Sequence, residues 1–125
     1  MSNKVETSKA PAVIGPYSQG MVVGNLIFTS GQIPLNPETG GLEGENITEQ
    51  THRVCKNLKA VLEESGSSLQ KVVKTVCFLN EMADFAGFNA VYSEYFTGKP
   101  ARSCVAVKEL PRGALVEVEV IAERE

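Results

Sequence analysis

The alternation of valine with glutamate over residues 115–122 is the feature that most constrains how this chain folds. Successive side chains of a β-strand point to opposite faces of its sheet. As a strand, the segment separates its valines from its glutamates, with Val116, Val118 and Val120 on one face and Glu117, Glu119 and Ile121 on the other. The pattern therefore predicts a sheet with one buried apolar face and one face that carries carboxylates.

A second strand is predicted just before it, over residues 100–107, and a turn at Leu110–Gly113 separates the two. On this earlier strand, Arg102 and Cys104 share one face. If the two strands pair directly with their valine faces together, Arg102 and Cys104 lie on the same face as the two glutamates. We therefore expect one surface that holds a guanidinium, a thiol and two carboxylates.

The remaining elements are predicted from residue periodicity and turn signals. They are strands at 17–23, 26–30 and 72–79 and helices at 47–65 and 84–97. Gly24–Asn25 joins the first two strands, because both residues tolerate the positive φ of a two-residue hairpin turn. Residues 1–10 are polar and are expected to be flexible.

The predicted order, β-β-α-β-α-β-β, favours an α+β fold built on a mixed sheet. Each helix is followed by a strand that can return to the same sheet by a right-handed crossover, so both helices are expected on one face. The other face would stay bare in a single copy, and we therefore expect a homo-oligomer in which sheets pack together. At 125 residues, the chain is expected to form one domain, 1–125.

Charge and composition argue against several function classes. The net charge of -3 does not favour a nucleic-acid surface, which is usually basic. No apolar run approaches the roughly 18 residues of a membrane span, and residues 1–10 lack the features of a signal or transit peptide. The 3 cysteines show no paired spacing and are expected to be free thiols in a reducing compartment, the cytoplasm or an organelle.

No metal or phosphate-binding site is predicted. One histidine, His52, and scattered cysteines do not give the spacing of a metal site. The glycines at 40, 41 and 44 lack the strand-to-helix context of a phosphate-binding loop. We therefore expect a protein without a cofactor.

Four short blocks occur along the chain, at Gly15–Gln19, Thr29–Pro34, Pro100–Ser103 and Glu117–Glu119. With these blocks in this order, the chain resembles the RidA (YjgF-type) family from about residue 10 to residue 122. The resemblance implies a homotrimer with a chorismate-mutase-like α+β fold and ligand clefts between subunits. It also implies a 2-iminobutanoate/2-iminopropanoate deaminase. Many members of the family hydrolyse reactive enamines and imines, released by pyridoxal-phosphate-dependent serine/threonine dehydratases, to 2-keto acids and ammonia.

The resemblance also implies roles for individual residues. Arg102 fits the substrate carboxylate, because its planar fork donates two parallel hydrogen bonds. Glu117 resembles the family residue that holds the attacking water and receives or relays its proton. The substrate-binding residues that the family implies are Tyr17, Ser30, Gly31, Phe85, Asn89, Arg102 and Cys104.

Plainer interpretations of the same residues stay open on the sequence alone. Arg102 fits a surface salt bridge, and alternating glutamates on a strand often mark a solvated face. Cys104 is a conceivable nucleophile, although imine hydrolysis needs no covalent intermediate and the only histidine lies on a predicted helix. Glu117 and Glu119 are expected about 7 Å apart on one face, so their charges interact, and the sequence does not tell which one is protonated.

Two other functions compete with the deaminase. One is a trimeric carboxylate-binding protein with a regulatory or chaperone-like role. The presence of both Arg102 and Glu117 favours the enzyme over it, because binding a carboxylate requires only the arginine. The other is a translation-inhibiting ribonuclease, which the acidic balance and the lack of interleaved basic and aromatic residues disfavour.

Overall fold

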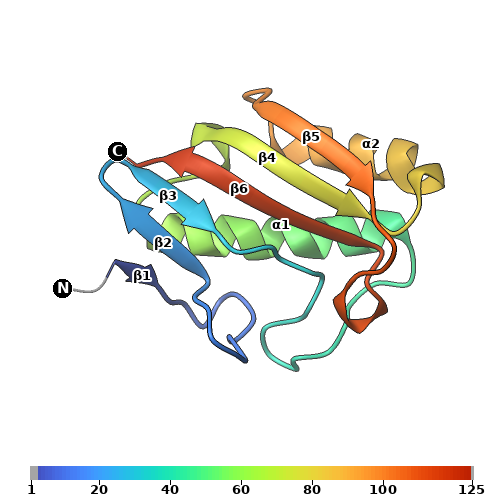
Figure 1. Cartoon of the computed structure of the whole chain (residues 1–125), viewed down its shortest axis with the longest axis horizontal. Coiled ribbons are helices and arrows are strands. Elements are labelled where there is room, and N and C mark those ends of the chain that lie inside the picture. Colours follow the sequence, from blue (N-terminus) through green and yellow to red (C-terminus); the bar gives the residue numbers. More distant parts are fainter. Residues whose placement is uncertain (1–2, 125) are drawn as a thin grey trace.

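A computed structural model describes residues 3–124 and contains a six-stranded mixed sheet with two α-helices (Figure 1). The strands are β1 (Lys4–Val5), β2 (Gly20–Val23), β3 (Leu26–Thr29), β4 (Val72–Leu79), β5 (Ala101–Ala106) and β6 (Val116–Glu123). The helices are α1 (Ile47–Glu64) and α2 (Phe85–Tyr95), with short 3-10 turns at Leu69–Lys71, Met82–Asp84 and Pro111–Gly113. The predicted α+β fold is confirmed, with one strand more than predicted.

The additional strand, β1, lies in a segment that the sequence analysis expected to be flexible. Its two residues pair antiparallel with the start of β2, and Val5 is buried. The buried amide of Gln19 then ties down the chain that follows, donating to the carbonyl of Thr7 at 3.0 Å and to that of Pro11 at 2.9 Å. The expectation of flexibility is therefore wrong for residues 3–10, and residues 1–2 lie outside the described part.

The strands follow the order β1-β2-β3-β6-β4-β5, so β5 and β6 do not pair. Strand β4 lies between them, parallel to β5 and antiparallel to β6. The long crossover through α2 carries the chain from β4 to the outer edge, where β5 pairs, and β6 then returns to the middle of the sheet (Figure 1). The direct pairing of the last two strands that the sequence analysis assumed is therefore wrong.

This insertion of β4 turns Arg102 and Cys104 toward the helices. Through β4, Cys104 lies in register with Val118 of β6, and residues in register on neighbouring strands share a face. Val118 is fully buried on the helix face, whereas Glu117 and Glu119 flank it and point to the opposite face. The prediction that Arg102 and Cys104 share a surface with both glutamates is therefore wrong.

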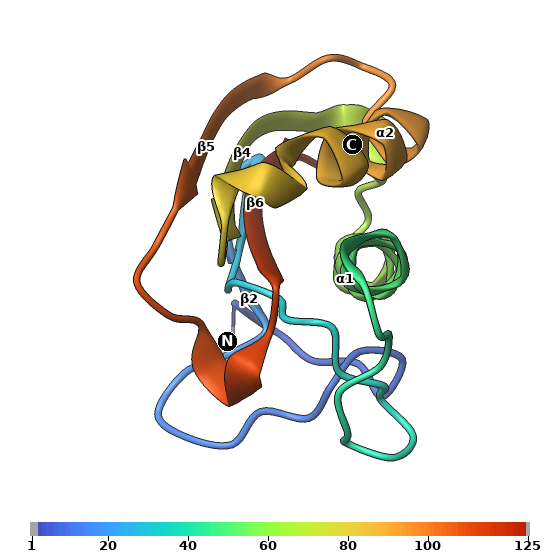
Figure 2. The ribbon, with the colours of Figure 1, turned by 90° about the vertical axis from the view of Figure 1, so that its right-hand side faces the viewer.

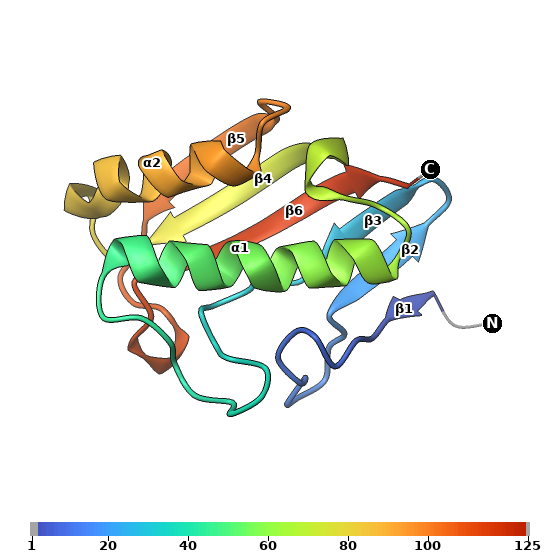
Figure 3. The ribbon, with the colours of Figure 1, turned by 180° about the vertical axis from the view of Figure 1, so that it is seen from behind.

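Helix α1 supplies most of the helix-side core. Asn46 caps its start, accepting a hydrogen bond at Oδ1 from the Glu49 amide at 2.9 Å. One face of the helix is fully buried against the sheet, with Val54, Leu58, Val61 and Leu62. Figure 2 shows both helices on one side of the sheet, and Figure 3 shows them lying across the strands.

Helix α2 is shorter than the predicted 84–97 segment, because a 3-10 turn precedes it and the chain leaves the helix at Phe96. Asp84 makes no side-chain cap hydrogen bond. Three rings form a ladder along the buried side: Phe88 and Tyr92 have centroids 5.4 Å apart, and Tyr92 stacks on Phe96 at 4.5 Å. The Tyr92 hydroxyl lies 2.8 Å from the Thr75 hydroxyl, so α2 is fixed over β4 and β5.

The opposite face of the sheet carries no helix within residues 3–124 (Figure 2). It mixes Glu117 and Glu119 with exposed apolar side chains, including Phe28 at 40% and Val105 at 47% exposure. The helices within this part of the chain are too short or too polar to cross a membrane.

Candidate functional site

The structure divides the predicted site residues into two groups on opposite faces of the sheet. We call Phe85, Asn89, Arg102 and Cys104 the arginine group, and Tyr17, Ser30, Gly31 and Glu117 the glutamate group. Arg102 and Glu117 stand two strands apart, with a register offset of three residues. These offsets amount to roughly 10 Å in each direction, so one chain does not bring the two side chains together.

The arginine group is built where α2 crosses the edge strand β5. Phe85, Asn89 and Tyr92 follow one another at helical spacing on the side of α2 that faces β5. The Cζ atom of Arg102 lies 4.7 Å from the ring centroid of Tyr92 and 5.4 Å from that of Phe85. Aromatic faces attract a guanidinium, so the two rings hold its plane in place.

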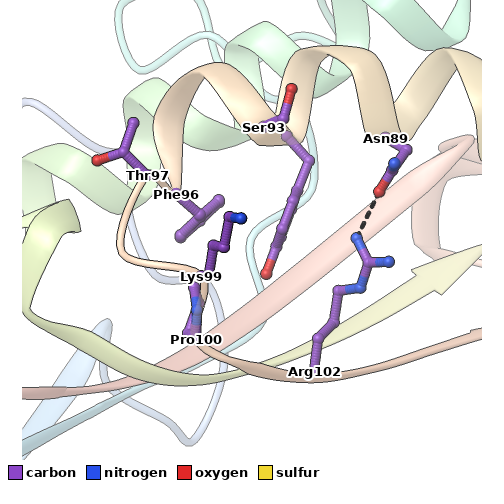
Figure 4. Close-up of a pocket in the computed structure, with 8 residues that line it drawn as sticks. Asn89, Ser93, Phe96, Thr97, Lys99, Pro100 and Arg102 are labelled. Atoms are coloured by element: carbon purple, nitrogen blue, oxygen red, sulfur yellow. Dashed lines mark hydrogen bonds between the residues drawn. The ribbon is translucent and has the colours of Figure 1, made fainter.

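A single hydrogen bond completes the support of the guanidinium. Nη1 of Arg102 donates to Oδ1 of Asn89 at 2.7 Å (Figure 4). Within residues 3–124, the guanidinium makes no other hydrogen bond and no ion pair, although it is half-buried. A guanidinium has five N–H donors, so most of them are available to an anion. Asn89 therefore positions Arg102.

A groove of about 570 Å³ opens beside Arg102 between α2 and the start of β5 (Figure 4). We call it the α2–β5 groove. Its lining is Asn89, Tyr92, Ser93, Phe96, Thr97, Lys99, Pro100 and Arg102. Of these residues, the sequence predicted only Asn89 and Arg102 as site residues; Tyr92, Ser93, Phe96, Thr97 and Lys99 were not predicted. The signal was the helical spacing of Asn89, Tyr92, Ser93 and Phe96 ahead of the Pro100–Ser103 block.

Cys104 lies close to Arg102, on the same face of β5. Burial raises the pKa of its thiol, and the nearby guanidinium offsets this only in part. His52 does not activate it, because the ring Nδ1 of His52 is 2.8 Å from the Tyr95 hydroxyl, at the contact of α1 with α2. The thiol is thus neutral and lacks the base that a nucleophilic cysteine requires.

The glutamate group centres on the half-buried carboxylate of Glu117. Burial raises the pKa of Glu117, and the negative charge of Glu119 raises it further. Within residues 3–124, this carboxylate makes no hydrogen bond or ion pair, so its oxygens are open to water. Gly31 lies directly against it, and a Cβ at position 31 would overlap Oε2 of Glu117. A larger residue at position 31 would therefore displace the carboxylate of Glu117 from its present position.

The other two members of the glutamate group stand at the edge of this carboxylate site. Tyr17 is 55% exposed and lines a small cavity of about 70 Å³ together with Gly31. The hydroxyl of Ser30 donates a hydrogen bond to the carbonyl of Ser18, so its oxygen can only accept a hydrogen bond from a ligand. Within residues 3–124, no group of three or more histidine, cysteine or acidic side chains is arranged to hold a metal ion.

A six-stranded mixed sheet with two helices on one face places the protein in the class of small α+β proteins. The family model described as endoribonuclease L-PSP matches residues 7–124. The chain therefore belongs to the endoribonuclease L-PSP family, which is the RidA (YjgF-type) family.

Relatives in the family carry several names. A RutC family protein of Pyrococcus abyssi is 55% identical over 120 residues, covering 95% of this chain and 94% of the relative. A Lactococcus lactis protein named as a proposed regulator, AldR, is 51% identical, with 95% of each chain covered. The 2-iminobutanoate/2-iminopropanoate deaminase of Escherichia coli K12 is 44% identical over 128 residues, with 99% of each chain covered.

Solved structures of relatives have the same fold. The crystal structure of Escherichia coli TdcF with bound serine superposes with a TM-score of 0.92 at 39% sequence identity, and 98% of each chain is covered. One member of the family therefore binds a small amino acid on this fold.

Proposed function

We propose that the protein hydrolyses 2-imino acids, such as 2-iminobutanoate and 2-iminopropanoate, to 2-keto acids and ammonia without a cofactor. The observation that carries the proposal is the supported and largely unpaired guanidinium of Arg102, which suits a substrate carboxylate. The deaminase name of a relative at 44% identity and the serine bound by TdcF agree with a small substrate of this kind.

Glu117 supplies the acid–base chemistry in this proposal. Its carboxylate holds a water and takes one of its protons while the water oxygen bonds to the C=N carbon, and the resulting carboxyl gives that proton to the nitrogen. The carbinolamine then collapses: the Glu117 carboxylate takes the hydroxyl proton and passes it to the amino group, the C–N bond breaks as the C=O bond forms, and ammonia departs. A raised pKa makes this carboxyl better suited than an ordinary glutamate both to accept and to return a proton.

The two groups lie on opposite faces, so the complete site requires two copies of the chain. We therefore propose a homotrimer in which the arginine group of one subunit meets the glutamate group of the next. The exposed apolar side chains on the same face of the sheet as Glu117, such as Phe28 and Val105, agree with a sheet face that a partner covers. The remaining family positions, among them Tyr17, Ser30 and Phe85, would line this cleft.

Subunit mixing tests the shared site. Arg102→Ala and Glu117→Gln are each expected to be nearly inactive in a coupled assay, in which a serine/threonine dehydratase generates the imine and ammonia release is timed. In mixed trimers, an intact arginine can meet an intact glutamate, and we expect part of the activity to return. Mixtures as inactive as their parents, or a monomer by light scattering, contradict the shared site.

A regulatory, carboxylate-binding role is a second candidate, because a relative at 51% identity is named as a proposed regulator. The coupled assay separates the two functions: a regulator binds 2-ketobutyrate but does not accelerate ammonia release. RNA cleavage, which the family description names, is disfavoured by the net charge of -3. The three free thiols of Cys55, Cys77 and Cys104 suit a reducing compartment such as the cytoplasm.

A further inference from the structure

The α2–β5 groove holds two cationic side chains and no acidic one. Lys99 and Arg102 both line it, and both reach from the β5 side toward α2 (Figure 4). The neighbouring acid on α2, Glu94, is not part of the lining. Its charge acts on the side of α2 that faces α1, where it raises the pKa values of Tyr95 and Cys55. Neither cation has an ion-pair partner within residues 3–124. The groove therefore has a positive charge that its own lining does not neutralise.

The backbone holds Lys99 at the mouth of this groove in an unfavourable conformation. Lys99 has a φ of 53°, a left-handed value that glycine and asparagine adopt far more readily than lysine. Its amide donates to the carbonyl of Phe96 at 3.2 Å, and Pro100 follows directly. Such a conformation persists only where the surrounding structure offsets its free-energy cost. Residues in such conformations cluster at ligand sites.

The groove has a larger volume and a longer apolar floor than a small monocarboxylate requires. Arg102 alone holds one carboxylate, and a four-carbon 2-keto acid leaves most of a volume of about 570 Å³ unoccupied. The aromatic rings of Tyr92 and Phe96 and the ring of Pro100 supply an apolar floor beside Arg102. If Arg102 binds the carboxylate of a ligand, an aliphatic side chain of that ligand that follows this floor would end near Lys99.

We propose that the α2–β5 groove is the pocket for the substrate side chain and that Lys99 selects 2-imino and 2-keto acids with a second carboxylate. This inference rests on the proposed function, because it requires that Arg102 holds the first carboxylate. Lys99 is then a specificity-determining residue that takes no part in the hydrolytic step. Ser93 and Thr97, on the last turn of α2 and just beyond it, offer hydroxyl donors to the same carboxylate.

Calorimetry with 2-ketobutyrate and 2-ketoglutarate at one fixed, low ionic strength tests the inference. We expect the wild-type protein to bind 2-ketoglutarate about three- to tenfold more tightly, the range between an exposed ion pair and a charge-assisted hydrogen bond. Lys99→Met should reduce this ratio to about one. Lys59→Met, a matched change of an exposed lysine on α1, should leave the ratio as in the wild type.

Each other outcome has a definite meaning. A wild-type protein that binds both keto acids equally overturns the inference, while loss of 2-ketobutyrate binding in Arg102→Ala would still support the proposed function. A Lys99→Met variant that retains the preference, or a Lys59→Met variant that loses it, also overturns the inference. If the wild-type protein binds neither keto acid, the proposed function fails as well.

Discussion

The arginine group and the glutamate group use their surroundings in opposite ways. Arg102 is held by partners of its own chain, with Asn89 at 2.7 Å and the ring centroid of Tyr92 at 4.7 Å. Glu117 has no such partner within residues 3–124, and burial together with Glu119 raises its pKa. The first group is organised to bind a charge of fixed shape, and the second is organised to exchange a proton.

Glu117→Gln should have the largest effect. The amide keeps the shape of the side chain but does not accept the proton of the attacking water, and acid–base groups contribute about 10²–10⁴-fold in rate. We expect ammonia release in the coupled assay to slow by that factor. Calorimetric binding of 2-ketobutyrate should stay close to wild type, and a variant that turns over at the wild-type rate contradicts the assigned role.

Gly31→Ala should reproduce part of this loss without changing the carboxylate itself. The new methyl group overlaps Oε2 of Glu117, so the carboxylate must move. A displacement of about 1 Å at a reacting group can cost 10²-fold in rate. We therefore expect a fall of about 100-fold in turnover, with 2-ketobutyrate binding retained. Unchanged turnover would mean that the position of Glu117 is not critical.

Arg102→Lys should weaken ligand binding by the arginine group. Lysine keeps the charge but has no fork, so one hydrogen bond to the carboxylate is lost, at about 1.5–3 kcal/mol. This predicts 2-ketobutyrate binding weaker by roughly 10- to 150-fold. Arg53→Lys makes the same change at an arginine on α1 that does not line the groove, and it serves as the matched control. Equal binding by Arg102→Lys and wild type would show that charge alone suffices.

Glu119→Gln should shift the pH dependence with a smaller effect on the maximal rate. If the ionised form of Glu117 is the base, activity falls as the pH drops through its raised pKa. Removal of the Glu119 charge lowers the pKa of Glu117, so the acid limb of the kcat/KM profile should move to lower pH. Burial remains the larger cause and should keep the limb above that of an ordinary glutamate. A shift to higher pH contradicts this coupling.

Cys104→Ser should have the smallest effect. The thiol has a raised pKa, and imine hydrolysis requires water and no thiolate. We expect ammonia release within about twofold of wild type, since the change is nearly isosteric and half-buried. Loss of turnover in a protein that still binds 2-ketobutyrate and retains its oligomeric state would identify the sulfur as a reacting group.

The sequence by itself determined the local elements of this protein. Its valine–glutamate alternation correctly predicted that Val116, Val118 and Val120 are buried with the glutamates opposite. The strand predicted over 72–79 coincides with β4, and the helix predicted over 47–65 is α1 to within one residue. These successes share one reason: a period of two or 3.6 residues is a property of neighbouring residues in the chain.

Only the tertiary structure decided which strands are neighbours, and this decided the site. The alternation of side chains along β5 places Arg102 and Cys104 on one face of that strand, but the pairing with β4 decides that this is the helix face. Likewise, Lys4–Val5 becomes a strand only because β2 offers a free edge. Strand order depends on crossovers and on contacts between residues far apart in the chain, and no local period records them.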